Sequence, residues 1–528
     1  MTKREIIYVL DCGSQYAHLI VRRIRHFKIQ AELVAPNTTL SQLAQARGIV
    51  ISGGPSSVIK KGAVRVNKKI YQLGVPILGI CYGQQLIAHD LGGKVTTSAQ
   101  REYGPTAINI TKSNPLFKGL KKQQVAWMSH ADKVTKLPPG FVRLASSQNT
   151  KIGAMVDSKR QIYATQFHPE VTHTAAGQKV IDNWLKITGV KRTWTMRNFS
   201  QGKIGEIKEL VGKDKVVCAL SGGVDSSVAA VLLHKAVGKK LHCIYVDTGL
   251  MRQGETAQIV KTFRSYQKIN LNVIRAEKQF LTRLKGVIDP EQKRKICGDL
   301  FIRIFEKEAK KIGSLGQRPG SQSRQKRDLG KAKWLVQGTL YTDAVTSGVS
   351  VGKKTVVIKS HHNVGGLPKK FGFKLIEPFR YLYKDEVRQI GRLLKLPKSV
   401  TERQPFPGPG LAIRIIGEVT KEKLKILRRA DAILQEEIDQ LPTKQKPQQA
   451  FTVLPSLRSV GIQGDNRTYG YLIAIRAIAT KDYMTADWAK LPNTVLDKIS
   501  TRITNEIKEV NRVVYDITAK PPATVEWE

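Results

Sequence analysis

Hydrophobic and polar positions alternate along the first 190 residues with two characteristic lengths. Short apolar runs, bounded by Gly, Pro or polar turns, have the length of buried strands. Longer segments with apolar residues at helical spacing lie between them. Strand–helix alternation of this kind predicts a mostly parallel, doubly wound α/β sheet. The expected strands are 6–10, 31–35, 48–52, 75–80, 107–112 and 162–169, and the expected helices are 18–27 and 66–74.

A break in the periodicity near 188–200 separates this region from a second one with the same alternation. In a third region the strand and helix patterns no longer alternate regularly, which predicts an α+β fold. We therefore expect an α/β protein with two doubly wound parallel-sheet domains followed by a smaller α+β domain. The expected domains are 1–190, 191–400 and 401–528. The later patterns are strands 215–220, 241–247, 449–455 and 469–478 and helices 229–237, 421–438 and 494–513.

Composition adds two exclusions to this picture. With 41% hydrophobic and 25% charged residues, the chain has too much apolar content for a disordered polycation. No apolar run approaches the roughly 18 residues that span a bilayer, and no leader-like segment precedes the first expected strand, so we expect no membrane role. The five cysteines form no CxxC pair, which favours a reducing cytosol.

The net charge of +46, from 88 Lys and Arg against 42 Asp and Glu, suggests nucleic acid as a partner until its distribution is considered. The three expected domains carry net charges of +17, +26 and +3, so the excess is spread over two folded regions. The most basic stretch, 313–333, is expected to be an exposed insertion. Because the motifs below point to small anionic ligands, we expect that nucleic acid is not a substrate.

A nucleophile elbow is predicted at Gly79–Gly83, where an apolar strand meets a helical segment and Cys81 stands at the turn. A cysteine at a helix N-terminus is favoured as thiolate, and it needs a base with an orienting acid. His168 and Glu170 follow a strand and share a face of an extended segment, so they supply both. Backbone N–H groups near Gly54, which follows another strand, are a candidate oxyanion hole.

The segments GICYGQQ, ISGGPSS and TQFHPE resemble the class I glutamine amidotransferases over residues 5–190. The resemblance implies hydrolysis of glutamine to glutamate and ammonia through a γ-glutamyl thioester. It makes Cys81 the nucleophile, His168 the base and later acid, and Glu170 its orienting partner, with Gly54 at the oxyanion. The residues that it implies for the glutamine pocket are Gln85, Ser129, His130 and Asp132.

A second site is predicted at the SGGVDSS loop, residues 221–227, between a strand and a helix. Backbone N–H groups at a helix N-terminus bind phosphate, and a carboxylate at Asp225 suits a Mg²⁺ ion that bridges to the phosphates. The loop resembles the ATP pyrophosphatases, which adenylate a substrate oxygen, so we expect ATP as co-substrate and no tightly bound organic cofactor. The expected ATP-binding residues are Ser221, Gly222, Gly223, Val224, Asp225, Ser226, Ser227, Val246 and Lys359.

The C-terminal third, with RQPFPGPGLAIRI and NRVVYDITAKPPATVEWE, closely resembles the glutamine-hydrolysing GMP synthetases. The resemblance implies that ATP adenylates xanthosine 5′-monophosphate, and that glutamine-derived ammonia then displaces AMP to give GMP. It also implies a cytoplasmic homodimer formed through residues 401–528, whose low net charge agrees with self-association. The residues implied for the substrate nucleotide are Arg294, Gln463, Lys520 and Glu526.

Three positions depart from the family pattern. Ala131 replaces the usual Gly in the WMSHAD segment, and it is strained if this position has a positive φ. Thr342 and Thr346 stand where the family more often has Pro and an acidic residue, and Thr346 is assigned no role. The adjacent His361 and His362 are not expected to bind a metal, because neighbours on an extended chain point apart.

Two alternatives stay open on the sequence alone. NAD synthetase also combines an amidotransferase with a pyrophosphatase, but its usual glutaminase lacks this Cys elbow and it would not end in KPPATVEWE. A nucleic-acid-binding or tRNA-modifying pyrophosphatase also uses SGGxDS, although no zinc-knuckle spacing, RNP-type motif or basic–aromatic stripe occurs here. Turnover of xanthosine monophosphate rather than deamido-NAD would exclude the first, and steeply salt-dependent RNA binding would support the second.

Overall fold

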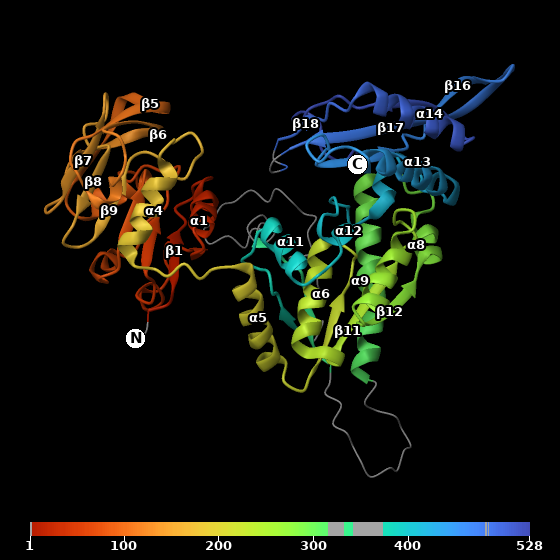
Figure 1. The fold of residues 1–528 in the computed structure, drawn as a ribbon, viewed down its shortest axis with the longest axis horizontal. Helices are drawn as coiled ribbons and strands as arrows, with labels where there is room; N and C mark the ends of the chain where they lie inside the picture. The colour runs from red at the N-terminus through yellow and green to blue at the C-terminus, as the bar shows by residue number, and fades with distance from the viewer. Residues whose placement is uncertain (1–2, 315–331, 342–372, 481–482, 484) are drawn as a thin grey trace, which may run out of the picture. The chain divides into compact units, whose positions relative to one another are not determined.

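The computed structural model describes residues 3–314, 332–341, 373–480, 483 and 485–528. These residues form two compact units, one up to Phe199 and one from Ser200 to Glu528 (Figure 1). Lys359, the threonines at 342 and 346 and most of the expected basic insertion at 313–333 lie outside the described residues.

The first unit is built on a nine-stranded sheet in the order β2-β1-β3-β4-β9-β8-β7-β5-β6. Strands β2 to β9 along this order are parallel, and the remaining four are antiparallel to their neighbours. The parallel strands β1, β3, β4 and β9 are buried along their whole length, as expected for apolar runs covered on both faces. The strands are β1 (Ile6–Leu10), β2 (Gln30–Val34), β3 (Gly48–Ile51), β4 (Ile77–Ile80), β5 (Lys94–Ile110), β6 (Gln123–Lys136), β7 (Val142–Ser147), β8 (Ala154–Asp157) and β9 (Ile162–Thr165).

Helices connect the parallel strands of this unit, and α1 packs against α4. The sheet edge at which β4 and β9 end carries the proposed catalytic residues, because the carboxyl ends of neighbouring parallel strands meet there. The helices are α1 (Ala17–His26), α2 (Leu40–Leu43), η1 (Lys68–Gln72), α3 (Tyr82–Asp90), η2 (Pro115–Phe117) and α4 (Gly177–Thr188).

The second unit begins with α5 and a five-stranded, fully parallel sheet in the order β12-β11-β10-β13-β14. The chain order reverses beside β10, and ligands of open α/β sheets bind at such a switch point, beyond the carboxyl ends of the strands. The strands are β10 (Lys215–Ala219), β11 (Leu241–Asp247), β12 (Asn270–Arg275), β13 (Ala332–Val336) and β14 (Lys374–Ile376). The helices are α5 (Met196–Val211), α6 (Val224–Val237), η3 (Gly238–Lys240), α7 (Glu255–Val260), the π-helix η4 (Lys261–Tyr266), α8 (Glu277–Leu284), α9 (Pro290–Ser314), α11 (Lys384–Leu393) and α12 (Lys398–Thr401).

The last 120 residues add a second sheet to this unit, in which β17 pairs with β15, β16, β18 and β19. One hydrophobic core joins the two parts: Val217 and Leu335 of the parallel sheet belong to the same cluster as Leu427 and Ile475. The expected boundary near 400 therefore crosses a continuous core, and the three-domain division stays a prediction. The elements are η5 (Gly410–Arg414), α13 (Lys421–Asp439), β15 (Gln449–Val453), β16 (Arg458–Gln463), β17 (Asn466–Ala479), β18 (Asp487–Trp488), α14 (Asn493–Glu506) and β19 (Val510–Tyr515).

The expected fold class is confirmed, and two of the expected helices are shorter in the structure. The helix expected at 66–74 is only the short 3₁₀ helix η1, which ends before Gly74 with its φ of +61°. The helix expected at 494–513 stops at Glu506, because the β-branched run that follows pairs with β17 as β19. Within the part of the chain that the structure describes, no helix is long and apolar enough to cross a membrane.

Candidate active sites

Cys81 stands at a sharp turn between β4 and α3, as the nucleophile-elbow pattern predicts. Its backbone has φ +52° and ψ −102°, a conformation that costs free energy for a residue with a side chain and recurs at catalytic positions. Two glycines make the turn possible. A Cβ at Gly83 would lie 2.3 Å from the carbonyl oxygen of Ile51, and one at Gly79 would lie 2.5 Å from Ile87. The strain is thus supported by close packing on both sides of the thiol.

His168 and Glu170 lie together beyond the end of β9, the strand that pairs with β4. The imidazole Nδ1 is 2.7 Å from a carboxylate oxygen of Glu170, and both side chains are buried. Burial lowers the pKa of His168, but the Glu170 carboxylate and the contact with Cys81 together raise it by more. The pKa of His168 therefore lies well above its ordinary value. The imidazole therefore lies beside the thiol, in position to exchange a proton with it.

Two side chains that the sequence analysis did not identify also lie beside Cys81 and His168. The Gln166 amide lies 3.7 Å from the Cys81 sulfur, and the ring of Tyr16 meets the His168 ring edge-on at 5.4 Å. Gly53 lies against the same imidazole, since a Cβ there would be 3.1 Å from its Cε1 atom. Gln166 was in principle predictable, because it precedes His168 by two residues and so shares its face of an extended segment.

Gly54 and Gln85 lie near this array for different structural reasons. A Cβ at Gly54 would be 2.5 Å from the carbonyl oxygen of Cys12, so only glycine allows the close approach of the two backbones. The buried Gln85 amide donates to the Asp132 carbonyl at 2.8 Å, which ties α3 to β6. The carbonyl oxygen of Ser129 lies 3.7 Å from the Cys81 sulfur.

His130 and Asp132, from the same segment of β6, are buried and face β5. The Asp132 carboxylate accepts a hydrogen bond from Thr97 at 2.7 Å. His130 Nε2 lies 3.2 Å from Glu102, yet burial lowers the pKa of this histidine, so it is neutral at neutral pH. Ala131 lies inside β6 and is not one of the described non-glycine residues with positive φ. The strain considered for this substitution therefore does not arise.

Residues 221–227 run from the turn after β10 into the first turn of α6, and their own serines hold them together. The hydroxyls of Ser221 and Ser226 are 2.9 Å apart, and the Gly223 N–H donates to Ser221 at 3.3 Å. Ser227 is fully buried, and Val224 begins α6. Because α6 begins soon after β10 ends, its N-terminus lies close to the carboxyl end of that strand, and backbone N–H groups there favour a bound anion.

Asp225, in the first turn of α6, pairs with the Lys384 ammonium at 2.5 Å. Gly338, in the loop after β13, packs on the same turn, because a Cβ there would lie 3.2 Å from Asp225 and from the Ser226 nitrogen. No cluster of three or more His, Cys, Asp or Glu suited to a metal occurs among the residues that the structure describes. The side chain of Val246 is buried in the core, which leaves its backbone as the part available to a ligand.

The residues expected to bind the substrate nucleotide all lie in the second unit, and three of them contact other parts of the chain. Arg294 in α9 donates to the backbone carbonyl of Glu528. The Lys520 ammonium donates to the Tyr483 carbonyl at 2.7 Å. Glu526 forms a two-point ion pair with Arg414, at 2.9 and 3.0 Å. The fourth, Gln463, ends β16.

Segment 526–528 is held in place by ion pairs from its first and third residues. Glu526 and Glu528 point inward to Arg414 and Lys293, whose side chains are both fully buried. The Lys293 ammonium is 2.6 Å from Glu528 and also donates to the Ile415 carbonyl at 2.7 Å. This spacing is that of an extended chain, in which residues two apart share a face. The polar composition of this segment alone predicts fraying. Two buried cations instead pair with the side-chain carboxylates of Glu526 and Glu528.

Comparison with known proteins gives matches along most of the chain. The model of glutamine amidotransferase class-I matches residues 8–187, and that of the GMP synthase C terminal domain matches residues 436–527. A model described as tRNA methyl transferase HUP domain matches residues 214–273 only. The last match covers the loop that tRNA-modifying pyrophosphatases share, so by itself it does not distinguish the two alternatives left by the sequence.

Full-length relatives make that distinction. The chain is 54% identical to GMP synthase (glutamine-hydrolyzing) of Carboxydothermus hydrogenoformans, over 99% of both chains. It is 52% identical to the protein of that name from Caldicellulosiruptor saccharolyticus, over the whole of both chains. The likeness to the Clostridium botulinum protein of that name is 50%, over 99% of this chain and all of the relative. The similarity extends through all three expected domains.

Proposed function

The chain belongs to the family of glutamine-hydrolyzing GMP synthases, and from this premise we propose which of its residues carry out the reaction. It is a carbon–nitrogen ligase of GMP biosynthesis that hydrolyses glutamine and uses ATP to aminate xanthosine 5′-monophosphate. One observation carries the residue assignment: a strained cysteine, a buried histidine with a raised pKa and a buried glutamate meet at one sheet edge.

In the glutaminase half-reaction, the Cys81 thiolate attacks the γ-carboxamide carbon of glutamine. The imidazolium of His168, held by Glu170, donates its proton to the departing ammonia, and a γ-glutamyl thioester remains. His168 then accepts a proton from water as it attacks the thioester, which releases glutamate and the thiolate. The backbone N–H of Gly54 stabilises the negative oxygen in both steps.

Four residues are proposed to form the glutamine pocket. Gln85 and Asp132 are already joined by a hydrogen bond that fixes α3 to β6 beside the thiol. The neutral state of His130 suits it to accept or donate one hydrogen bond without adding charge. Ser129 offers its carbonyl oxygen close to the sulfur, where it can accept from the substrate amide.

In the synthetase half-reaction, the loop at 221–227 is proposed to hold the pyrophosphate of ATP through backbone N–H groups. The C2 oxygen of xanthosine monophosphate attacks the α-phosphorus, pyrophosphate leaves, and ammonia then displaces AMP from C2. Mg²⁺ fits at Asp225, because this ion usually takes one or two carboxylates together with phosphates, and it would neutralise phosphate charge. Asp225 would exchange Lys384 for that ion. The remaining ATP contacts are proposed at Val246 and Lys359.

The nucleotide is proposed to bind along Arg294, Gln463, Lys520 and Glu526. Arg294 and Lys520 supply the positive charge that a phosphate monoester requires. Both are already directed to backbone carbonyls, so the phosphate would share or replace these acceptors. Glu526 has its carboxylate fixed by Arg414, which leaves it oriented before the nucleotide arrives.

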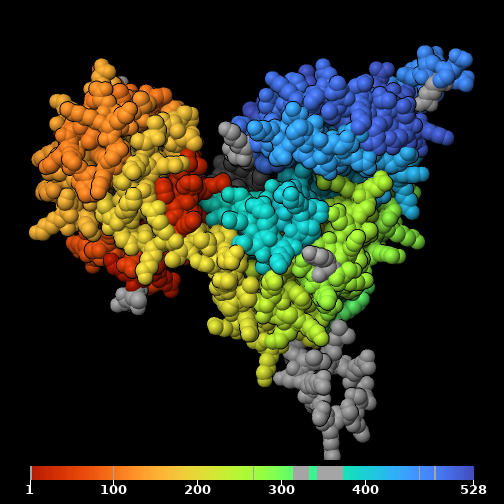
Figure 2. Space-filling view, in the orientation of Figure 1, coloured from red at the N-terminus to blue at the C-terminus, as the bar shows by residue number. Residues whose placement is uncertain are grey.

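A homodimer through residues 401–528 is supported by exposed apolar residues on the β16–β17 hairpin, which projects from the second unit (Figure 2). Ile462 is 79% exposed and Tyr469 is 65% exposed, and Leu457 and Val460 lie close to them in the chain. β16 is also at an edge of its sheet, with backbone groups free to pair across a two-fold axis. A cytoplasmic location is proposed because all five cysteines are unpaired and buried.

The assignment is tested by Cys81→Ala, assayed with glutamine and then with ammonium. We expect glutamine-dependent synthesis to fall by about 10⁴-fold or more, because the nucleophile is lost. Ammonium-dependent synthesis should persist, since the second unit does not use the thiol. Cys12→Ala is the matched control, because burial raises the pKa of that thiol to about 12 and keeps it unreactive. Loss of both activities in Cys81→Ala would contradict the two-site scheme.

A further inference from the structure

Arg403 connects the phosphate-binding loop to a part of the chain 181 residues away. Its guanidinium donates a hydrogen bond to the backbone carbonyl of Gly222. The side chain is only 10% exposed, and it also forms an ion pair with Glu255 at the start of α7. Burying a guanidinium costs much more free energy than one hydrogen bond to a carbonyl oxygen returns. The position of Arg403 therefore suggests a role beyond packing.

The contact controls the orientation of one peptide group. Gly222 has a φ of +77°, and in a trans peptide its C=O and the N–H of Gly223 point in opposite directions. A donor that holds the carbonyl on one side therefore turns the Gly223 N–H to the other. In the structure this N–H makes a long hydrogen bond of 3.3 Å to Ser221, within the anion-binding turn. A carbonyl oxygen turned into that turn would instead repel phosphate.

Tight packing keeps the loop against the arginine. A Cβ at Gly222 would lie 2.4 Å from a methyl group of Ile259 and 3.1 Å from the guanidinium of Arg403. The arginine is fixed in turn, because Arg388 donates to its backbone carbonyl at 2.9 Å. Both partners of the hydrogen bond are therefore held by further contacts.

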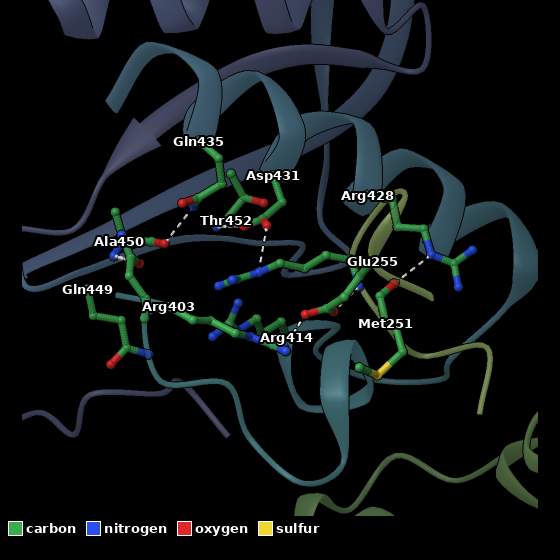
Figure 3. A network of polar contacts seen from close by, with 12 residues as sticks. Met251, Glu255, Arg403, Arg414, Arg428, Asp431, Gln435, Gln449, Ala450 and Thr452 are labelled. Carbon is green, nitrogen blue, oxygen red and sulfur yellow. Dashed lines mark hydrogen bonds and ion pairs between the residues drawn. The ribbon is translucent and has the colours of Figure 1, made fainter. Parts of the chain in front are cut away.

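Three arginine–carboxylate pairs surround one aromatic ring at this point. The guanidinium carbons of Arg403, Arg252 and Arg414 lie 5.6, 4.9 and 5.2 Å from the centre of the Phe406 ring. Figure 3 shows Arg403 and Arg414 converging with Glu255 below α13. Three like charges so close together need compensation, and each has its own carboxylate. The pairs are Arg403–Glu255, Arg252–Asp431 and Arg414–Glu526.

We propose that Arg403 is a positioning residue for ATP: by holding the Gly222 carbonyl, it directs the Gly223 N–H toward the bound phosphates. This rests on the proposed role of the 221–227 loop in ATP binding. The guanidinium itself stays on the side of the loop away from the phosphates, paired with Glu255. Its loss therefore weakens ATP binding without removing a group that touches the reacting atoms.

The test is Arg403→Met in the full-length enzyme, assayed with ammonium in place of glutamine. We expect the KM for ATP to rise about tenfold or more, with kcat and the KM for xanthosine monophosphate changing by about twofold at most. Amides in segment 220–226 should exchange faster with deuterium in the variant without ATP. Arg403→Lys keeps the positive charge but replaces the planar guanidinium with a compact ammonium group. It should therefore recover part of the ATP affinity that Arg403→Met loses. Arg264→Met is the control, since Arg264 also donates to a backbone carbonyl, that of Leu271.

The outcomes separate the two levels of the proposal when Asp225→Asn is measured in parallel. If Asp225→Asn impairs the use of ATP but Arg403→Met leaves the KM for ATP unchanged, the positioning role of Arg403 is wrong and the assignment of the 221–227 loop to ATP stands. If neither variant affects the use of ATP, the loop assignment is wrong as well. A fall in thermal stability with an unchanged KM for ATP would also overturn the proposal. Should Arg403→Met fail to fold, Arg403→Lys and Glu255→Gln decide by the same criterion.

Discussion

The proposed catalytic side chains of the first unit contact one another, whereas the proposed ligand-binding side chains of the second unit contact distant parts of the chain. His168 and Glu170 form a buried couple beside Cys81. In the second unit, Asp225 pairs with Lys384 and Glu526 pairs with Arg414, at separations of 159 and 112 residues. The two units thus prepare for their substrates in different ways.

This difference follows from the chemistry of each half-reaction. A covalent nucleophile must have its base and orienting acid in place before the substrate arrives, because proton transfer depends on their geometry. A site for phosphates instead gathers positive charge, which would repel itself in the empty enzyme unless carboxylates balance it. Ion pairs within the chain supply that balance, and the substrates then replace or share some of them.

Among the variants that test this comparison, the largest effect is expected from deletion of residues 520–528. The deletion removes Lys520 and Glu526 and leaves the buried Arg414 and Lys293 without their carboxylates, so synthesis with ammonium should fall by at least about 10³-fold. Glutaminase activity should remain, since the residues proposed for it lie within the first unit. Both activities are measured on the same preparation, and retained synthesis would refute the role of this segment. Glu526→Gln serves as a milder variant with the segment intact.

Lys293→Met tests how strongly the second unit depends on its internal pairs. Removing the ammonium leaves the largely buried Glu528 carboxylate without its ion pair, so the free energy of unfolding should fall by about 3 kcal/mol. The double variant with Glu528→Gln should recover much of this loss, because the stranded charge is then removed. Chemical denaturation of the three proteins measures both effects. Lys310→Met, which breaks the exposed pair with Glu306, is a surface control, and equal losses in the single and double variants would exclude the pairing explanation.

Glu170→Gln tests the couple of the first unit. The substitution removes the negative charge that raises the pKa of His168, so the imidazolium loses its proton at lower pH. We expect kcat/KM for glutamine to fall by about 10²-fold, and the basic limb of its pH profile to move to lower pH. Asp182→Asn, which alters a surface carboxylate of the same unit, should leave the profile in place. An unshifted basic limb would mean that Glu170 does not set the pKa of His168.

The smallest effect is expected from Lys384→Met. Lys384 pairs with Asp225 and competes with the proposed Mg²⁺ for the same carboxylate. The pair is partly exposed and is worth no more than about 1 kcal/mol, so the Mg²⁺ concentration for half-maximal synthesis should fall by up to about fivefold. Titration of Mg²⁺ at saturating ATP measures this. A higher Mg²⁺ requirement would show that Lys384 assists the phosphates instead of competing with the metal.

The sequence predicted the first site more completely than the second, for a physical reason. Cys81, His168 and Glu170 stand in short motifs at strand ends, and parallel strands bring such ends together without further information. Arg403 and Lys293 were not predicted, because their partners are 181 and 235 residues away and no local pattern links them. The overextended helix at 494–513 has the same cause, since the pairing of β19 with β17 is a long-range contact.

The inward-facing carboxylates of segment 526–528 have a consequence for the order in which the enzyme is made. Translation proceeds from the N-terminus, so the residues proposed for glutamine hydrolysis, the last of which is Glu170, are synthesised about 360 residues before Glu528. At roughly 5–20 residues per second, that interval is about 20–70 s. Lys293 and Arg414 receive their partners only when residues 526–528 have been synthesised. The residues proposed for glutamine hydrolysis are therefore all synthesised well before the carboxylates of the proposed nucleotide site.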